Sequence, residues 1–351
     1  MGWHVGTRTT GAIALAAGLC AAAAHAVAPA HQFRVVGGLA GVNQYTQWEE
    51  PFWTRELPRI SGGRFKAEIV PFDRAGVPGE DMLRLLQLGV VPMATVLMSG
   101  LTAQYPEYTA PDLAGLNPDM ASARAAVAAF RPFLEKNLRE QHGVRLLAVY
   151  AYPAQVVFCK KAFSALAELA GRRVRVSSAG QADFMEALGA RPVQLPFARI
   201  VAQIESDSID CAITGTLSGH GLGLHQVTSH LHAMPLNWGL ALFGANQGAW
   251  EALPAELRQL LASELPKLEE AIWTQSESDT RRGMACNTGQ AACAQGRKGA
   301  MALVPVTPQD ERRRQEIFTN TVLPRWLQRC GQRCADVWRQ TRGPTLRANP
   351  P

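Results

Sequence analysis

The chain has 351 residues, 47% of them hydrophobic, with 35 basic and 29 acidic side chains and a net charge of +6. The charges are scattered and no basic stripe alternates with aromatic residues, so we expect no nucleic-acid partner. A mild positive bias is compatible with a small anionic ligand.

Residues 1–26 are typical of a secretory signal peptide. Arg8 precedes an apolar run rich in Ala and Gly, and Ala24-His25-Ala26 has the A-x-A pattern of a cleavage site. The run is too short to span a membrane comfortably, and no other stretch comes closer. Leu19 stands before Cys20 where a lipoprotein signal prefers a small residue. We therefore expect a soluble, exported, periplasmic protein of about 325 mature residues in two lobes.

The first half of the mature chain alternates strands and helices. Phe33–Val36 predicts a strand, and the following glycine-rich turn, residues 37–41, lacks both the Gly-Lys-Ser/Thr of a phosphate loop and the GxGxxG spacing of a dinucleotide site. Further strands are expected at 64–70, 90–95 and 144–152, and helices at 44–57, 80–88 and 119–138. Pro51 and Pro132 should bend their helices. In the second half, Thr307-Pro308-Gln309-Asp310 predicts a helix start, with Thr as N-cap and Pro at the first position, and the chain from Arg342 is expected to form a loose tail.

The stretch from Leu169 to Thr216 is the most informative. It predicts a strand at 173–177, a helix closed by Gly189, and a second strand at 209–213. Such short alternation indicates a mostly parallel α/β sheet, in which ligands lie beyond the carboxyl ends of the strands. Arg175 lies near one such end, and Thr214 and Gly215 lie at another.

Three motifs in this stretch resemble one known family. They are Gly171-Arg172-Arg173-Val174-Arg175, Gly189-Ala190-Arg191-Pro192-Val193-Gln194-Leu195-Pro196-Phe197 and Ile209-Asp210-Cys211, in the order and spacing of the DctP-like solute-binding proteins of TRAP transporters. The resemblance implies an α/β, two-lobed periplasmic binding protein fold, with a ligand cleft between the lobes and a long helix bracing both. Residues 27–152 would form lobe 1, with about 233–260 returning to it. Residues 153–232 would form lobe 2, with about 275–351 contributing, and the long helix would span 254–285.

The resemblance assigns Arg175 to the solute. In the family, the arginine of this strand makes a two-pronged salt bridge with the carboxylate of an organic acid, and a planar guanidinium suits that role. The alternative is an arginine in a surface or interdomain ion pair.

Six further residues are candidate solute contacts. Many family members have a second arginine near Gln155, so an amide there predicts a solute with a single carboxylate. Thr214 stands where a carboxylate in some relatives allows a metal to bind, so we expect no metal and no cofactor. The remaining candidates, each with packing as the alternative, are Tyr152, Phe197, Trp238 and Ser99.

Histidines and cysteines are the residues most able to form a metal or redox site in this chain. His220, His225, His230 and His232 lack H-E-x-x-H spacing, so ordinary histidines are favoured over a zinc site. An exported protein can oxidise its cysteines. Four clustered cysteines allow three pairings, which the spacing leaves open: Cys286, Cys293, Cys330 and Cys334. Cys159 and Cys211 each lie in an apolar strand and are predicted to be buried thiols.

We therefore expect a protein that captures an organic acid, in first place a monocarboxylate, and delivers it to a TRAP membrane permease. An exported enzyme is the alternative class, but G-x-S-x-G, H-E-x-x-H and C-x-x-C motifs are all missing. A ligand-binding sensor subunit with the same fold is a third reading.

Overall fold

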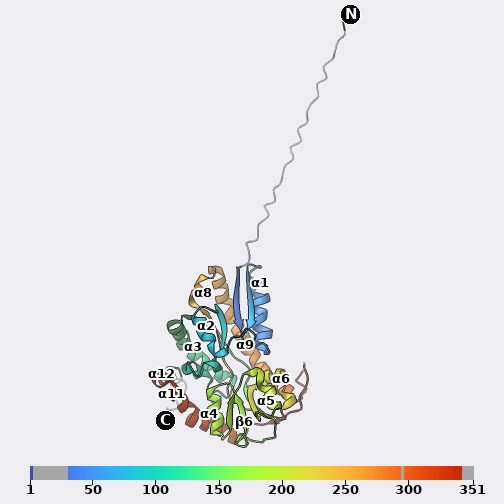
Figure 1. The fold of residues 1–351 in the computed structure, drawn as a ribbon, viewed down its shortest axis with the longest axis vertical. Helices are drawn as coiled ribbons and strands as arrows, with labels where there is room; N and C mark the ends of the chain where they lie inside the picture. The colour runs from blue at the N-terminus through green and yellow to red at the C-terminus, as the bar shows by residue number, and fades with distance from the viewer. Residues whose placement is uncertain (3–30, 294–295, 342–351) are drawn as a thin grey trace.

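The structure is a computed structural model that describes residues 1–2, 31–293 and 296–341. The expected signal peptide and the expected C-terminal tail from Arg342 lie outside these residues, apart from the first two. The described chain forms two lobes, one above the other in Figure 1, each built on a mixed β-sheet.

The first lobe contains a five-stranded sheet in the order β2-β1-β3-β10-β4. Its strands are β1 His31–Gly37, β2 Phe65–Pro71, β3 Met93–Leu97, β4 Val144–Tyr150 and β10 Ala241–Asn246. The strands β1, β2 and β3 pair in parallel, whereas β10 is antiparallel to both β3 and β4.

The second lobe contains a six-stranded sheet in the order β11-β9-β5-β8-β6-β7. Its strands are β5 Gln155–Cys159, β6 Arg173–Val176, β7 Arg191–Gln194, β8 Cys211–Gly215, β9 His230–His232 and β11 Ala302–Val304. The central stretch supplies β6, β7 and β8, which are parallel as expected. The antiparallel pairings involve β5 and β9, the strands next to the two crossings between the lobes.

Helices cover both sheets. The bounds of the α-helices are α1 Leu57–Ile60, α2 Met82–Gln87, α3 Met120–His142, α4 Ala179–Ala187, α5 Ile200–Glu205, α6 Thr216–Leu222, α7 Leu224–Val227, α8 Gln247–Ala252, α9 Ala255–Asn287, α10 Pro308–Ile317, α11 Leu323–Cys330 and α12 Gln332–Thr341. The 3-10 turns are η3 Gly79–Asp81, η4 Met98–Leu101, η5 Pro106–Asp112, η6 Leu166–Leu169 and η7 Phe197–Arg199, and the π turns are η1 Gln44–Glu49, η2 Phe52–Glu56 and η8 Phe318–Val322.

Helical segments continue through Pro51, through Pro132 of α3 and through Pro266 of α9. Pro51 stands between η1 and η2, whose wider π turns tolerate its missing N–H. Pro132 lies inside α3. By contrast, the expected helix start at Thr307 is confirmed: its hydroxyl accepts from the Asp310 amide, and Asp310 caps back in a reciprocal capping box.

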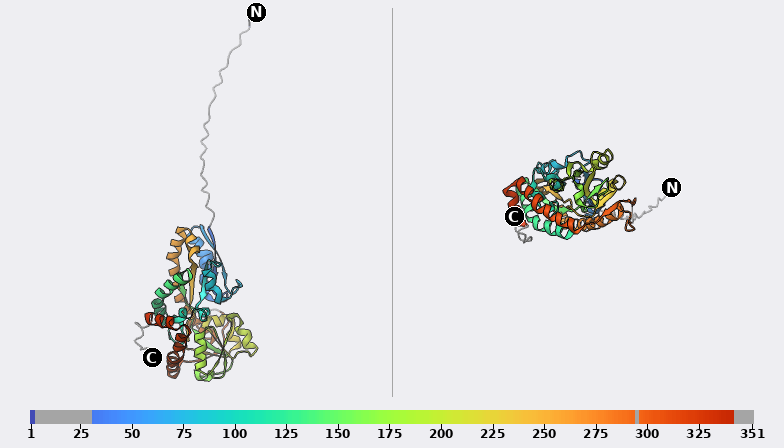
Figure 2. Two further views of the ribbon diagram at one scale, coloured as in Figure 1. Left: turned by 60° about the vertical axis from the view of Figure 1, so that its left-hand side comes forward. Right: turned by 90° about the horizontal axis from the view of Figure 1, so that it is seen from below.

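Helix α9 connects the two lobes (Figures 1 and 2). Its first half packs Leu257, Leu261 and Ile272 into a core cluster beneath the first sheet. Its second half lies against α6 so closely that a Cβ on Gly283 would stand 2.3 Å from the Leu217 nitrogen. The helix is therefore in tight contact with both lobes.

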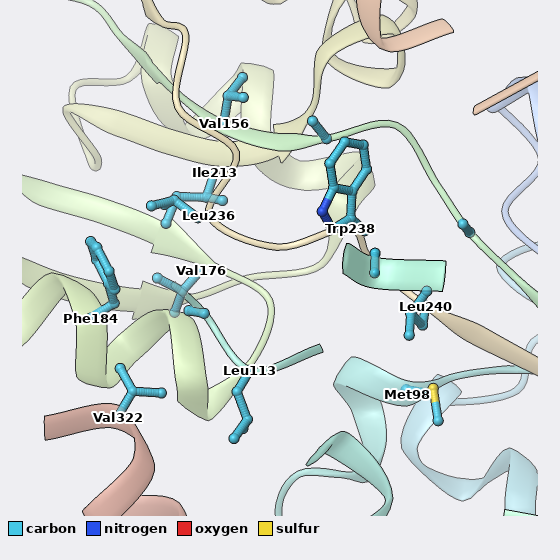
Figure 3. Packing of buried hydrophobic residues seen from close by; sticks show 14 of the residues in the cluster. Met98, Leu113, Val156, Val176, Phe184, Ile213, Leu236, Trp238, Leu240 and Val322 are labelled. Carbon is cyan, nitrogen blue, oxygen red and sulfur yellow. The ribbon is translucent and has the colours of Figure 1, made fainter. Parts of the chain in front are cut away.

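A second and larger core cluster runs from one lobe to the other. Figure 3 shows Val156 and Ile213 of the second sheet on one side and Met98 and Leu240 of the first lobe on the other, with the Trp238 indole between them. The segment that returns from β9 to β10 therefore contributes core residues at the junction of the lobes.

Candidate functional site

Arg175 lies on β6 between β8 and β7, paired with Ala212 on one side and Val193 on the other. Only 5% of the residue is exposed. Its Nε donates to the Leu195 carbonyl at 2.9 Å, and its Nη1 donates to the Ile213 carbonyl at 2.7 Å. No carboxylate of the described residues lies within ion-pair distance, and burial lowers the pKa of this guanidinium to about 10.

Burying a cation without a counter-charge is costly, because the charge loses its hydration. The two carbonyls orient the guanidinium but leave its charge uncompensated. The group remains protonated at neutral pH, so it can offer its remaining N–H groups to an external anion. A buried guanidinium held in this way has the chemistry needed to bind a carboxylate.

Gln155 begins β5 where the chain enters the second lobe. Its Nε2 donates to the Pro153 carbonyl at 2.9 Å, and its backbone pairs with Asn237 of the returning segment. The same Nε2 lies 3.0 Å and 3.2 Å from the points where side chains on Gly239 and Gly215 would begin. The amide therefore lies where both crossing segments meet the end of β8.

Three other candidates differ in their burial and position. Tyr152 is buried at the first crossing, and its amide donates to the Trp238 carbonyl. Phe197 is half-buried in η7 and packs against both core clusters, so it touches both lobes. Ser99 is half-buried in η4, directly after β3.

Two candidates have side chains that are already engaged in packing. The Trp238 indole lies in the core, and its Nε1 donates to the Asn117 carbonyl at 3.2 Å. Thr214 is buried on β8, with its methyl group 3.0 Å from where a Cβ on Gly219 of α6 would stand. A solute role for both residues stays a prediction.

A small cavity of about 120 Å³ lies where the two lobes meet α9. It is lined by residues 41–44 of the first lobe, Pro153 of the crossing, residues of α6, and Asp279 and Arg282 of α9. The buried Asp279 accepts from Asn43 of the first lobe at 2.9 Å and from Gln275 at 2.7 Å. Helix α9 is thus hydrogen-bonded to the first lobe at the same level at which it packs against the second.

Comparison with known proteins decides the family. Residues 43–320 of the chain match the model of one protein family, DctP, described as bacterial extracellular solute-binding protein, family 7. The chain belongs to this family. The resemblance inferred from the three motifs is therefore confirmed.

Solved structures of the same fold extend the comparison. The extracytoplasmic solute receptors DctP7 and DctP6 of Bordetella pertussis, both binding pyroglutamic acid, are 23% and 19% identical to the chain, with TM-scores of 0.77 and 0.79. The alignments cover 88% and 89% of this chain and all of each receptor. A TRAP periplasmic solute-binding protein from Desulfovibrio salexigens with bound orotic acid has 16% identity and a TM-score of 0.75, over 87% of this chain and 96% of its own. The expected two-lobed α/β fold is confirmed by these likenesses.

The prediction that Cys159 and Cys211 are buried thiols is wrong. The two cysteines form a disulfide. They are directly opposite each other on the antiparallel strands β5 and β8, with Cα atoms 4.1 Å apart. Sequence alone did not reveal this pairing, because it depends on the register of two strands 52 residues apart. The four clustered cysteines pair as Cys286–Cys293 and Cys330–Cys334.

The four histidines lie at two places. The rings of His220 and His225 stack with centroids 4.3 Å apart. His230 and His232 lie on β9, where His232 is buried with its Nε2 3.8 Å from an Asp310 oxygen. Burial lowers the pKa of His232 and of His225. Across residues 31–293 and 296–341, no three His, Cys, Asp or Glu side chains gather in a way that could hold a metal ion.

One candidate was missed from the sequence. Glu49 is fully buried at the end of η1, beside Tyr152. Its signal was present in the sequence, because Tyr45, Glu49, Phe52 and Trp53 follow helical spacing and place an acid in an apolar stripe.

Among the helices of the described residues, none combines the length and the apolar character that a membrane span requires.

Proposed function

We propose that this protein is the periplasmic solute-binding component of a TRAP-type transporter, exported by a cleaved signal peptide. It captures an organic acid between its lobes and delivers it to membrane permease subunits. The observation that carries the proposal is the buried Arg175 guanidinium, which is oriented by two carbonyls and has no acid partner among the described residues. Family membership and the acids bound by the structural relatives support the same reading.

The solute is a small monocarboxylate. A single buried cation neutralises a single carboxylate, and Gln155 at the crossing is an amide that adds no second positive charge. Phe197 and Tyr152 supply ring surface to the body of the solute. Closure of the two lobes around it is the motion that this architecture serves. No catalytic group is needed, so the protein acts as a receptor rather than an enzyme.

A thermal-shift and calorimetry screen against organic acids tests the proposal. A solute at about 100 times its Kd should stabilise the native state by about 2.7 kcal/mol. Wild type should bind one carboxylate class, Arg175→Ala should lose that binding, and Arg173→Ala, two residues away on the same strand, should retain it. Binding that survives Arg175→Ala would refute the assignment.

A further inference from the structure

Asp112 bonds the segment by which the chain returns from the second lobe to the first. It lies at the end of η5, which packs against η4 and α3 of the first lobe. Its Oδ1 accepts from the Trp238 amide at 2.8 Å, and its Oδ2 accepts from the Asn237 side chain at 2.8 Å and from the Leu240 amide at 3.2 Å. These partners are all N–H donors, so they suit an ionised carboxylate. Desolvation raises the pKa of Asp112 to about 6, which leaves it ionised at pH 8.

Asn237 extends this connection into the second lobe. Its Oδ1 accepts from Gln181 Nε2 of α4 at 2.9 Å. The Gln181 Oε1 in turn accepts from the Ser177 amide at 2.8 Å and from the Ser177 hydroxyl at 3.1 Å. Asn237 is 4% exposed and Gln181 is fully buried, so both side-chain amides depend on protein partners rather than on bulk water. We call Asp112, Asn237, Gln181 and Ser177 the crossing network.

The crossing network has a single hydrogen-bonding direction. At one end the Ser177 amide can only donate, and at the other end the Asp112 carboxylate can only accept. The two side-chain amides between them must therefore both turn their oxygen toward Ser177 and their NH₂ group toward Asp112. A flip of either amide would place donor against donor at one contact and acceptor against acceptor at the other. The two ends thus determine the orientation of the middle.

The second-lobe end of the network lies next to the strand that carries Arg175. Ser177 directly follows β6, two residues beyond Arg175. The two hydrogen bonds from Ser177 to Gln181 therefore hold the carboxyl end of this strand. Asn237 also holds the first crossing, because its carbonyl accepts from the Gln155 amide at 2.9 Å. The network joins the end of β6, both crossings and η5.

Helix capping explains only part of this arrangement. Ser178 is the N-cap of α4, and its hydroxyl accepts from the Gln181 amide at 3.2 Å. A glutamine at the third helical position commonly accepts from the chain at the helix start. Capping does not require the donation from Gln181 to Asn237, or the one from Asn237 to Asp112, which join residues 56 and 125 positions apart. These two long-range bonds need another explanation.

We propose that Asn237 and Gln181 are positioning residues for solute binding, which fix the end of β6 that carries Arg175 to the returning segment and to Asp112. The inference rests on the proposed function, in which Arg175 binds the solute carboxylate. A two-pronged contact requires both N–H groups to be placed within about 0.5 Å. Asn237 and Gln181 do not need to touch the solute. They keep the end of the strand from shifting when the lobes close around the solute.

Isothermal titration calorimetry on the purified, signal-free chain at pH 8 tests this role. The probes are four small carboxylates, pyruvate, benzoate, orotate and malonate, and the one that binds wild type most tightly is used throughout. Asn237→Leu removes the long-range bonds but leaves the cap of α4 and the contacts of Arg175 in place. We expect this variant to bind the probe about 10-fold more weakly than wild type, because a displaced guanidinium loses one prong of its contact.

A double-mutant cycle separates positioning from general damage. If Asn237 acts through the paired N–H groups of Arg175, its effect should vanish once those groups are gone. Asn237→Leu should therefore weaken binding less than about 2-fold in the Arg175→Lys background, against about 10-fold in wild type. Damage that does not pass through Arg175 would weaken binding equally in both backgrounds.

Exchanging the two ends of one bond gives a rescue variant. Asn237→Asp alone brings two carboxylates together, and Asp112→Asn alone turns an NH₂ group toward N–H donors, so each should weaken binding. In the combined variant, an amide at position 112 can donate to a carboxylate at position 237, whose other oxygen still accepts from Gln181. The combined variant should therefore bind the probe more tightly than either single variant.

Asn246→Leu is the matched control for the loss of an asparagine with long-range bonds. Asn246 caps α8, and its Nδ2 donates to the Leu86 carbonyl at 2.9 Å, far from β6 in the other lobe. This variant should unfold at lower urea concentration than wild type and yet bind the probe with wild-type affinity.

The outcomes separate the two proposals. Wild-type affinity in Asn237→Leu, an equal cost in the Arg175→Lys background, or a combined variant that rescues nothing would each overturn the positioning role and leave the receptor function standing. Failure of all four acids to bind wild type would overturn both. If Asn237→Leu does not fold, Gln181→Met takes its place in the cycle with the same expected values.

Discussion

Arg173 and Arg175 lie two residues apart on β6, yet they have opposite electrostatic environments. Arg173 donates to both oxygens of Asp210, at 2.8 Å and 3.0 Å, and keeps 37% of its side chain exposed. This ion pair lowers the pKa of Asp210 to about 2. Arg175 is buried and bonds only to carbonyls within the described residues. The ion pair that was the alternative role for Arg175 is made instead by Arg173.

Replacing Arg175 by lysine tests whether geometry or charge holds the solute. Lysine keeps a positive charge but lacks the paired N–H groups that match a carboxylate. We expect solute affinity in Arg175→Lys to fall about 10- to 100-fold, measured by calorimetry. Arg173→Lys is the matched control and should bind as wild type does. Equal affinities of Arg175→Lys and wild type for the solute would show that the paired N–H groups of the guanidinium are not used in binding.

The raised pKa of Glu49 makes stability depend on pH. The pKa of Glu49 is about 7 in the folded state against a usual 4.5, so the fold favours the protonated carboxyl. The folded state therefore has its full stability below pH 4.5, where the carboxyl is protonated in both states, and loses stability as the pH rises through 7. At pH 8, Glu49→Gln should therefore exceed ligand-free wild type by about 3 kcal/mol in free energy of unfolding, and the two should converge near pH 4.5.

Urea unfolding of wild type, Glu49→Gln and Glu50→Gln at pH 4.5, 6.5 and 8 gives the three curves needed. The Glu50→Gln curve should follow wild type throughout. A pH-independent difference between wild type and Glu49→Gln would mean that the buried carboxyl does not titrate in this range.

The Cys159–Cys211 disulfide closes a long loop and should contribute strongly to stability. With a sequence separation of 52 between the cysteines, the chain-entropy model gives about 4 kcal/mol. The seven-residue separation of Cys286–Cys293 gives about 2 kcal/mol by the same relation. Urea unfolding of the two double Cys→Ala variants should show that order. Thiol titration of denatured, unreduced protein should find no free thiol at Cys159 or Cys211, and two thiols there would refute the bond.

Gly283 permits the close approach of α9 to α6. An added Cβ would stand 2.3 Å from the Leu217 nitrogen and 2.4 Å from the Thr216 carbonyl carbon, both backbone atoms that cannot rotate away. Alanine has a higher helix propensity than glycine. The steric clash outweighs this gain, so Gly283→Ala should lower the free energy of unfolding by about 1–3 kcal/mol. Gly41→Ala, which meets nothing within 4 Å, should be nearly neutral. A stabilised Gly283→Ala would contradict the packing described here.

Local sequence chemistry determined the pieces of this protein. The motifs around Arg175 predicted the family, and the alternation of apolar residues predicted the parallel strands of the central stretch. The Thr307–Asp310 cap predicted a helix start, because capping involves residues only three apart. These features depend on neighbours in the chain, so they can be read without the fold.

Only the tertiary structure decided the features that depend on distant partners. It paired Cys159 with Cys211 through strand register, and it separated Arg173 from Arg175 by placing Asp210 beside only one of them. It also brought Glu49, Gly38 and Tyr152 together from three segments, and it left Glu49 Oε1 without a hydrogen-bond partner among the described residues. The convergence of groups far apart in the chain arises only when each lobe folds, and no local pattern encodes it.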